Sequence, residues 1–245
     1  MEVHAHSHTP RRKWTHYFWE FLMLFLAVFC GFLAEYQLEH KIEHDREKQF
    51  IRSLVEDLSE DTITLAQLTE DLQANVERMD SLKFLLSSND IKNHGSDLYY
   101  LGRRASRGAW LALHDRTIQQ MKNSGAFRLI RNEKVSTAII EYYNRLNFIQ
   151  ILQSIDLSET EEYRRIAIGV FHPLIFDGVV TSDNSINKPE GNPQLLTYDR
   201  QTLFRMAGII SYSKNSRLAL AKAEAEMNVA AKELIDLLKK EYRLK

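Results

Sequence analysis

Residues 51–86 read IRSLVEDLSEDTITLAQLTEDLQANVERMDSLKFLL, and this stretch decides the fold. Its apolar residues recur every three and four positions in two interleaved rows. One row holds Ile51, Leu58, Leu65, Leu72, Met79 and Leu86, and the other holds Leu54, Asp61, Leu68, Asn75 and Leu82. A heptad pattern of this length is typical of a coiled coil or of the long helix of a bundle. Val55 and Val76 widen the apolar face, which favours packing against several helices.

Two polar residues, Asp61 and Asn75, interrupt the second row. Polar residues in a helix seam can fix register or oligomer state at some cost in stability. Alternatively, both side chains face water at the edge of a bundle. We call residues 51–86 the seam, and we expect it to serve either self-association or packing.

The sequence after the seam predicts further helices. Ser87 to Asp90 and Asn93 to Ser96 break the first helix, and a second is expected over 97–123, ended by Ser124-Gly125. Asn132 is a typical N-cap for a third helix that runs toward His172-Pro173. Residues 173–198 hold three of the four prolines and are expected to form a long loop. Two more helices are predicted, over 199–213 and 216–243.

The segment before the seam, residues 35–50, is charged nearly all round. Such a helix depends on ion pairs three and four residues apart, so we expect a solvated helical stalk. It contains His40, Glu43 and His44, which match the HxxEH pattern of inverted zinc metalloproteases. A catalytic zinc also needs a third protein ligand and a shaped cavity, and a polar stalk supplies neither. We therefore predict no metal site and no enzymatic activity.

Residues 14–34, WTHYFWEFLMLFLAVFCGFLA, predict one transmembrane helix. At about 1.5 Å per residue this segment spans roughly 30 Å, the thickness of the hydrocarbon core of a bilayer. Aromatic residues cluster at its two ends, as at membrane interfaces. Its long apolar run and poor cleavage site argue against a removed signal peptide. The lipid bilayer is therefore an expected partner.

Basic residues around the anchor set the expected topology. Arg11, Arg12 and Lys13 precede it directly, whereas Lys41, Arg46 and Lys48 follow at a greater distance. The nearer cluster favours a cytoplasmic N-terminus. A bacterial inner-membrane protein with a periplasmic C-terminal domain is then expected.

The anchor also contains an ionisable residue, Glu20. A carboxyl group inside a membrane span is costly and is a functional candidate, for example in an ion-driven complex. Alternatively, Glu20 lies close enough to the interface to reach outward, and His16 on the same helix face can pair with it. The small residues Ala27 and Gly31 lie four positions apart, and such spacing permits close helix approach and oligomerisation.

The domain organisation follows from these segments: a cytoplasmic tail at 1–13, the anchor at 14–34, the stalk at 35–50 and an extracytoplasmic bundle at 51–245. The tail carries His4, His6 and His8 at alternate positions, a tract that can bind a transition metal but in a short tail is expected to ligate only partially. The fold class is therefore all-α: a transmembrane helix, a long stalk helix and an antiparallel helical bundle.

Composition restricts the function. The formal net charge is −1, which argues against nucleic acid as a partner. Cys30 is the only cysteine and lies in the anchor, so a disulfide framework and a cysteine-based zinc site are excluded. The sequence contains no glycine-rich phosphate loop, GxSxG or CxxC motif, and no cofactor is expected.

The nearest approach to a site is a group of basic and aromatic residues in 103–131. The candidates for an anion or ligand site are Arg103, Arg107, Trp110 and Arg128. Arginine binds carboxylate or phosphate bidentately, and tryptophan can stack on a ligand. The alternative, which we favour, is that Trp110 belongs to the core and the arginines pair with acidic helix faces.

Two segments resemble a known family. These are residues 119–132, QQMKNSGAFRLIRN, followed by IEYY at 140–143, and the anchor residues 17–31. Both resemble a family of uncharacterised single-pass membrane proteins widespread in Bacteroidetes, a domain of unknown function. The resemblance implies a bacterial inner-membrane protein with a helical extracytoplasmic domain, and it implies that Ser124, Gly125 and Arg128 belong to a signature turn.

Taken together, these patterns predict a non-enzymatic, membrane-anchored interaction or scaffold subunit that associates through helices, with itself or with other inner-membrane proteins. The alternatives are a ligand-sensing bundle that signals through a membrane partner, and a subunit of an ion-driven complex that uses Glu20.

Overall fold

A computed structural model describes residues 14–108 and 110–244 of the chain. In these residues the regular structure consists of α-helices and short 3₁₀ helices, and Val180 and Ile186 form an isolated antiparallel bridge. The predicted all-α fold is confirmed. The chain divides into two compact units between Gln49 and Phe50, and each unit is described by itself.

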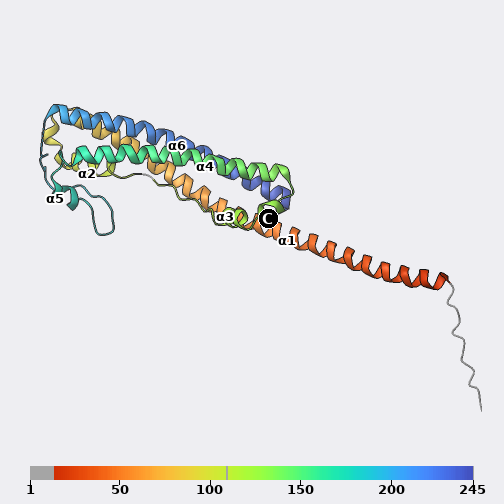
Figure 1. Ribbon diagram of the computed structural model, residues 1–245. Coiled ribbons are helices and arrows are strands. Elements are labelled where there is room, and N and C mark those ends of the chain that lie inside the picture. The colour runs from red at the N-terminus through yellow and green to blue at the C-terminus, as the bar shows by residue number, and fades with distance from the viewer. Residues whose placement is uncertain (1–13, 109, 245) are drawn as a thin grey trace, which may run out of the picture. The chain divides into compact units, whose positions relative to one another are not determined.

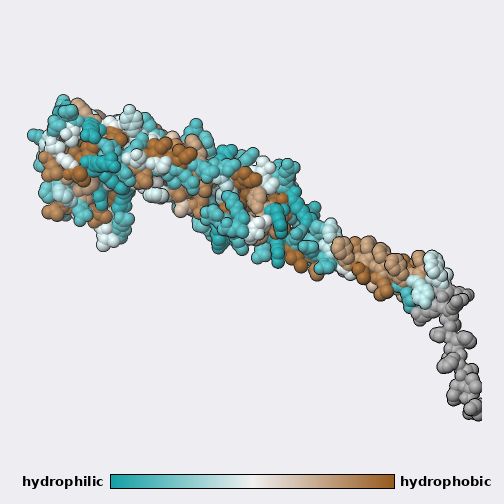
Figure 2. Space-filling view, in the orientation of Figure 1, coloured by the Kyte–Doolittle hydropathy of each residue, from teal (hydrophilic) through white to brown (hydrophobic). Residues whose placement is uncertain are grey.

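The first unit contains the N-terminal part of helix α1, whose full bounds are Trp14–Ser87. This is the one helix in the described part of the chain that is long and apolar enough to cross a membrane, and its most apolar window is wholly unburied. Phe21, Phe25 and Phe29 stack along one side, with ring centroids 6.2 and 5.9 Å apart. Figure 2 shows this segment as a continuous hydrophobic band. Its length and surface fit a membrane anchor. The histidine tract at 4–8 lies outside the described residues.

The second unit is a bundle of three long helices: the rest of α1, α4 (Glu133–Ala167) and α6 (Arg200–Tyr242), which lie side by side in Figure 1. Helix α6 runs antiparallel to both partners. On α6, Lys214 bonds Asp80 of α1, and Asn228 bonds the carbonyl of Thr62 of α1. Residue numbers thus decrease along α1 where they increase along α6. The contacts with α4 follow the same order, because Ser216 of α6 bonds Glu159 and Glu241 bonds Asn132. Helices α1 and α4 therefore run in the same direction.

A crossover between α1 and α4 returns the chain along the bundle. It contains η1 (Ile91–Asn93), α2 (Gly95–Ala105), α3 (Arg116–Asn123) and η2 (Ala126–Leu129). The predicted breaks after Ser87 and at Ser124-Gly125 are confirmed, and Gly125 has a left-handed φ of 67°. In Figure 1, α2 and α3 lie toward opposite ends of the bundle.

The single helix predicted over 97–123 is wrong, because residues 106–108 and 110–115 are irregular between α2 and α3. The carbonyls of Ser106 and Arg107 accept hydrogen bonds from arginines on other helices. Arg164 of α4 donates twice to Ser106, at 3.0 and 2.7 Å, and Arg217 of α6 donates to Arg107 at 2.8 Å. These tertiary bonds take up the carbonyls at the C-terminus of α2.

The third predicted helix is confirmed as α4, and the Asn132 side chain accepts a bond from the Val135 amide at 3.3 Å. It ends at Ala167, however, and Pro173 does not terminate it. Proline instead begins α5 (Pro173–Gly178), because a proline at the first helical position loses no intrahelical bond. The predicted loop at 173–198 is therefore partly helical.

The two helices predicted after residue 198 are one helix, α6, capped by Asp199, whose side chain accepts from the Thr202 amide at 2.8 Å. The expected gap at 213–216 is a polar stretch of this helix, in which Ser213 is buried, Lys214 and Ser216 are half-buried and Asn215 is exposed. Lys214 bonds both oxygens of Asp80 at 2.8 Å, and Ser216 bonds Glu159 at 3.1 Å. Polarity here reflects buried or paired side chains on a continuous helix.

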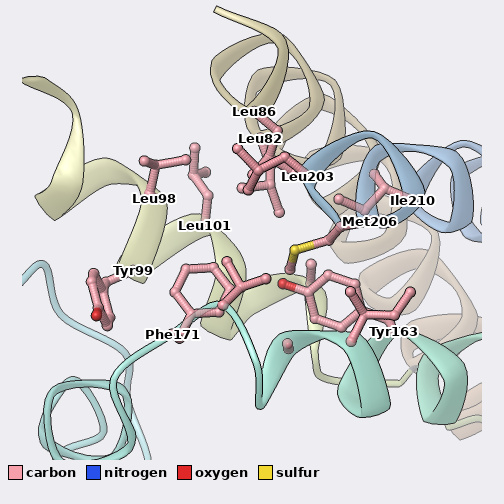
Figure 3. Close-up of a cluster of buried hydrophobic side chains, with 14 of the residues drawn as sticks. Leu82, Leu86, Leu98, Tyr99, Leu101, Tyr163, Phe171, Leu203, Met206 and Ile210 are labelled. Atoms are coloured by element: carbon pink, nitrogen blue, oxygen red, sulfur yellow. The ribbon is translucent and has the colours of Figure 1, made fainter. Parts of the chain in front are cut away.

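The core has two hydrophobic clusters separated by a polar layer. One contains Leu58, Leu65, Tyr142, Leu220 and Leu234 among others. Figure 3 shows the other, in which Phe171 lies between Tyr99 and Tyr163 and faces Leu101 and Met206. Between the clusters lie Asn75, Asp156, Thr160 and Arg217, and we call these four residues the polar layer.

The seam serves packing within this bundle. Ile51, Leu54, Leu58, Leu65 and Leu72 are buried by the same chain, and Leu68 packs against them. Neither polar seam residue faces water as an unpaired side chain. Asp61 is fully buried and accepts bonds from His114 and Tyr142, and Asn75 accepts one from Arg217.

Candidate anion-binding site

A pocket of about 260 Å³ opens over the polar layer, between α1, the segment after α2 and α6. Its walls hold an unusual share of arginine: Arg78 from α1, Arg104 from α2, Arg107 from the segment after α2, and Arg217 from α6. We call it the arginine pocket. Its other lining residues are Leu68, Asp71, Leu72, Asn75, Gly108 and Trp110.

Arg217 forms the floor and is only 1% exposed. Its Nε donates to Asp156 at 2.7 Å, one terminal nitrogen donates to Asn75 at 2.5 Å, and the other to Thr160 at 3.1 Å and to the Arg107 carbonyl at 2.8 Å. A buried guanidinium is tolerated only with such complete pairing. This arginine is therefore a fixed structural element that holds the end of α2 in place.

The other three arginines have no ion-pair partner in the part of the chain that the structure describes. In the described residues no carboxylate lies within 4.0 Å of the guanidinium of Arg78, Arg104 or Arg107. Arg107 instead donates to the backbone and side-chain oxygens of Asn184, both at 2.8 Å. Arg104 lies over the Tyr100 ring, 5.6 Å from its centroid, and its buried Nε has no acceptor in the described chain.

The pKa of Arg107 is lowered, first by burial and then by neighbouring positive charge. Burial lowers this pKa from its ordinary value, and the neighbouring Arg103 and Arg104 lower it further. Asp71 is the one acidic side chain that lines the pocket. An anion that entered would therefore be attracted by several guanidinium groups at once.

A second polar cluster positions the segment that carries Trp110. Asp61 accepts from the backbone amide of His114 at 2.8 Å, from its ring Nδ1 at 3.0 Å and from the Tyr142 hydroxyl at 3.2 Å. Burial raises the pKa of Asp61, and these hydrogen bonds oppose the increase. Asp57 bonds the Thr117 amide and Arg116 in the same region. The irregular residues 106–108 and 110–115 are thus held on the α2 side by Arg164 and Arg217 and on the α3 side by Asp57 and Asp61.

Trp110 is 69% exposed at the arginine pocket, so the interpretation that places it in the core is wrong. Polar contacts hold the segment on both sides of it, and this keeps the indole at the surface. The alternative pairing of the arginines holds for Arg116, which pairs with Asp57 at 3.1 Å, but not for Arg103, Arg104 or Arg107 in the described residues.

The structure brings together only two of the four predicted ligand-site residues, Arg107 and Trp110. Arg103 lines a different pocket, and Arg128 is exposed on η2, away from both. Sequence reasoning missed Arg78 and Arg217, which come from distant helices. Arg217 could have been found in the sequence, because it lies on the apolar stripe of an amphipathic helix, where an arginine indicates a buried, paired charge.

In the first unit, His16 and Glu20 lie on the same helix face with Nε2 and Oε1 3.6 Å apart, which confirms the expected pairing. Ala27 and Gly31 are exposed, and a Cβ added at Gly31 would meet nothing within 4 Å.

The HxxEH residues pair along the helix. His40 lies 3.8 Å from Glu43, and His44 lies 3.3 Å from Glu47. The described part of the chain contains no group of three or more histidine, cysteine or acidic residues that could hold a metal ion.

Comparisons with protein-family models, with curated proteins and with solved structures found no match to this chain.

Proposed function

We propose that this protein is a single-pass, membrane-anchored helical bundle that binds a small multivalent oxyanion, such as phosphate or a polycarboxylate, in the arginine pocket. The observation that carries the proposal is a set of three guanidinium groups around one cavity that have no carboxylate partner among residues 14–108 and 110–244. Guanidinium groups held around one cavity repel one another, and a bound anion relieves this repulsion. Arginine is suited to this task because its planar fork binds carboxylate and phosphate bidentately.

The anchored, ligand-binding bundle is best interpreted as a sensor or a receptor that recruits its ligand at a membrane. A bacterial inner membrane, with the bundle on the periplasmic side, is the location we propose from the basic residues that flank the anchor and from the family resemblance. Arg217 links the pocket to all three long helices through Asn75, Asp156 and the backbone of Arg107. A bound anion would therefore act on contacts that span the whole bundle.

The test is calorimetric titration of the purified full chain in detergent with phosphate and with citrate, at fixed ionic strength. We expect saturable binding that weakens at least tenfold in Arg78→Gln and in Arg104→Gln. The control is Arg165→Gln on α4, which removes the same charge from an exposed residue paired with Glu161 and Glu162. If Arg165→Gln weakens binding as much as the pocket variants, the anion responds only to net charge and the proposal fails.

A second candidate function is helix-mediated association with another protein, without chemistry. On the outer side of α4, Phe148, Ile151 and Ile155 are exposed at helical spacing and form an apolar stripe. Such a stripe is typical of interaction surfaces. Light scattering of the full chain in detergent would test self-association, which we expect to be lost in Ile151→Glu and kept in Ser154→Glu. If the wild type is a monomer, self-association is wrong, and the apolar stripe can then serve only association with a different protein.

A further inference from the structure

A second pocket, of about 370 Å³, lies between the end of α2, the end of α4 and α5. Its wall is mainly apolar and includes Ile168, Phe171, Pro173 and Phe176. The Phe171 and Phe176 rings are stacked, with centroids 4.7 Å apart and planes inclined by 19°. We call it the α5 pocket. Its size lies at the lower end of the range for small-molecule sites.

Two arginines give this apolar cavity a positive side. Arg103 lines it with its guanidinium over the Phe176 ring, 5.1 Å from the centroid, and its buried Nε has no acceptor in the described residues. Arg164 lines it too, and its Nε and one terminal nitrogen both donate to the Ser106 carbonyl. Within the described chain no carboxylate lies within ion-pair distance of either guanidinium, although Asp177 lines the same pocket.

An apolar wall with an unneutralised cation at its edge selects an amphipathic anion. The apolar body of such a ligand gains free energy by leaving water, and its anionic end gains a charge-assisted hydrogen bond. A purely polar anion would leave the phenylalanine wall unused, and a neutral apolar ligand would leave the arginine charges unpaired. Ile168 is 78% exposed at this pocket, so the apolar wall reaches the surface where a ligand can enter.

We infer that the α5 pocket binds a small amphipathic carboxylate, with its apolar body on Phe171 and Phe176 and its carboxylate facing Arg103 and Arg164. This site is separate from the arginine pocket, because the two cavities share no lining residue: Arg103 lines the α5 pocket and Arg104 lines the arginine pocket. It does not depend on the proposed function, and either site can fail without the other.

Asp177 gives the inference a directional test. It is an exposed acidic residue at the end of α5, and a bound carboxylate would be repelled by it. Removing its charge should therefore strengthen binding of a carboxylate, which is the opposite of what a loss of structure does.

The experiment uses 3-phenylpropionate as the probe, because it is amphipathic but stays in water, and measures its affinity for the full chain in detergent by calorimetry and ligand-observed NMR. We expect saturable binding that weakens about tenfold in Arg103→Gln and in Phe176→Ala and strengthens two- to fivefold in Asp177→Asn. The neutral analogue 3-phenylpropanamide should bind at least tenfold more weakly. Arg78→Gln, in the arginine pocket, should leave the affinity unchanged.

Equal affinity for the acid and the amide would overturn the inference, and so would an unchanged or weaker affinity in Asp177→Asn. Asp177→Asn keeps the test valid if Arg103→Gln proves unfolded by circular dichroism, since the altered side chain is exposed. Phosphate titrations of Asp177→Asn and Phe176→Ala separate the two sites, because neither residue lines the arginine pocket.

Discussion

At the scale of single residues, Gly102 determines how closely α2 approaches the core. A Cβ built on Gly102 would lie 2.4 Å from Cζ of Phe171, a buried ring in the hydrophobic cluster. Overpacking of this kind costs roughly 1–3 kcal/mol. We predict that Gly102→Ala lowers the free energy of unfolding by that amount, measured by urea denaturation.

The matched control is Gly208→Ala on α6, where an added Cβ meets nothing within 4 Å. Alanine in an exposed helix interior is favoured over glycine by roughly 0.5–1 kcal/mol, so this variant should be more stable than the wild type. Similar effects in both variants would show that helix propensity, and not the contact with Phe171, governs position 102.

Glu224 is a buried carboxyl group on α6 whose Oε2 atom has no hydrogen-bond partner in the described residues. Burial raises its pKa from 4.5 to about 7. The folded protein therefore binds this proton more tightly than the unfolded chain does. Stability should be highest below the unfolded pKa, fall as pH rises through the interval from 4.5 to 7, and stay reduced above it.

We therefore predict that Glu224→Gln, which keeps the shape and removes the titration, stabilises the bundle at pH 8 by roughly 3 kcal/mol relative to the wild type. The gain should shrink toward zero near pH 4.5, because Glu224 is then protonated. Thermal unfolding at pH 5, 6, 7 and 8 measures this difference. A gain that does not change with pH would mean that ionisation of Glu224 is not its source.

At the scale of elements, α3 depends on a carboxylate from another helix. It has only eight residues, too few for a stable isolated helix. Asp115 occupies the N-cap position but makes no capping hydrogen bond. Buried Asp57 of α1 accepts from the Thr117 amide at 3.0 Å and so performs the capping function.

We predict that Asp57→Ala costs about 1–2 kcal/mol, the usual loss for a helix cap, and selectively raises amide exchange in residues 116–123. Asp115→Ala should have a smaller effect, since among the described residues the Asp115 side chain accepts a bond only from the Gln119 side chain, at 3.1 Å. Hydrogen-exchange mass spectrometry on both variants decides this. Equal loosening of α3 would assign the cap to Asp115.

Local signals account for the elements that sequence reasoning predicted correctly. The Asn132 cap, the turn at Gly125 and the break after Ser87 are each determined by residues adjacent in sequence. The errors arose where distant side chains decide the backbone. Asp57 and two arginines hold the gap between α2 and α3. Residues 213–216 resemble a loop because they are polar, and Asp80 and Glu159 on other helices bond Lys214 and Ser216.

At the scale of the whole molecule, the sequence predicted only some of the residues that line the candidate site. Arg107 and Trp110 lie three residues apart and could be recognised as a local group. Arg78 and Arg217 join them only because α1 and α6 run antiparallel and meet at the polar layer. No periodicity reveals which arginines lack acidic partners, since that depends on what the fold places nearby.

The division of the chain at Gln49–Phe50 leads to the last prediction. Both hydrophobic clusters and the polar layer consist of residues after 49, and the apolar surface of the anchor takes no part in them. A fragment of residues 50–245 should therefore be soluble without detergent, helical by circular dichroism, and bind phosphate with the affinity of the full chain.

The full chain should instead stay with membranes through alkaline carbonate extraction, because roughly 20 apolar residues suffice to span a bilayer. In the full chain, Leu24→Arg should release part of the protein, since a charge near the centre of a span costs roughly 2.5–3.5 kcal/mol. An insoluble or unfolded fragment would show that the bundle needs the N-terminal unit to fold, and full release of the wild-type chain by carbonate would remove the anchor from the proposed function.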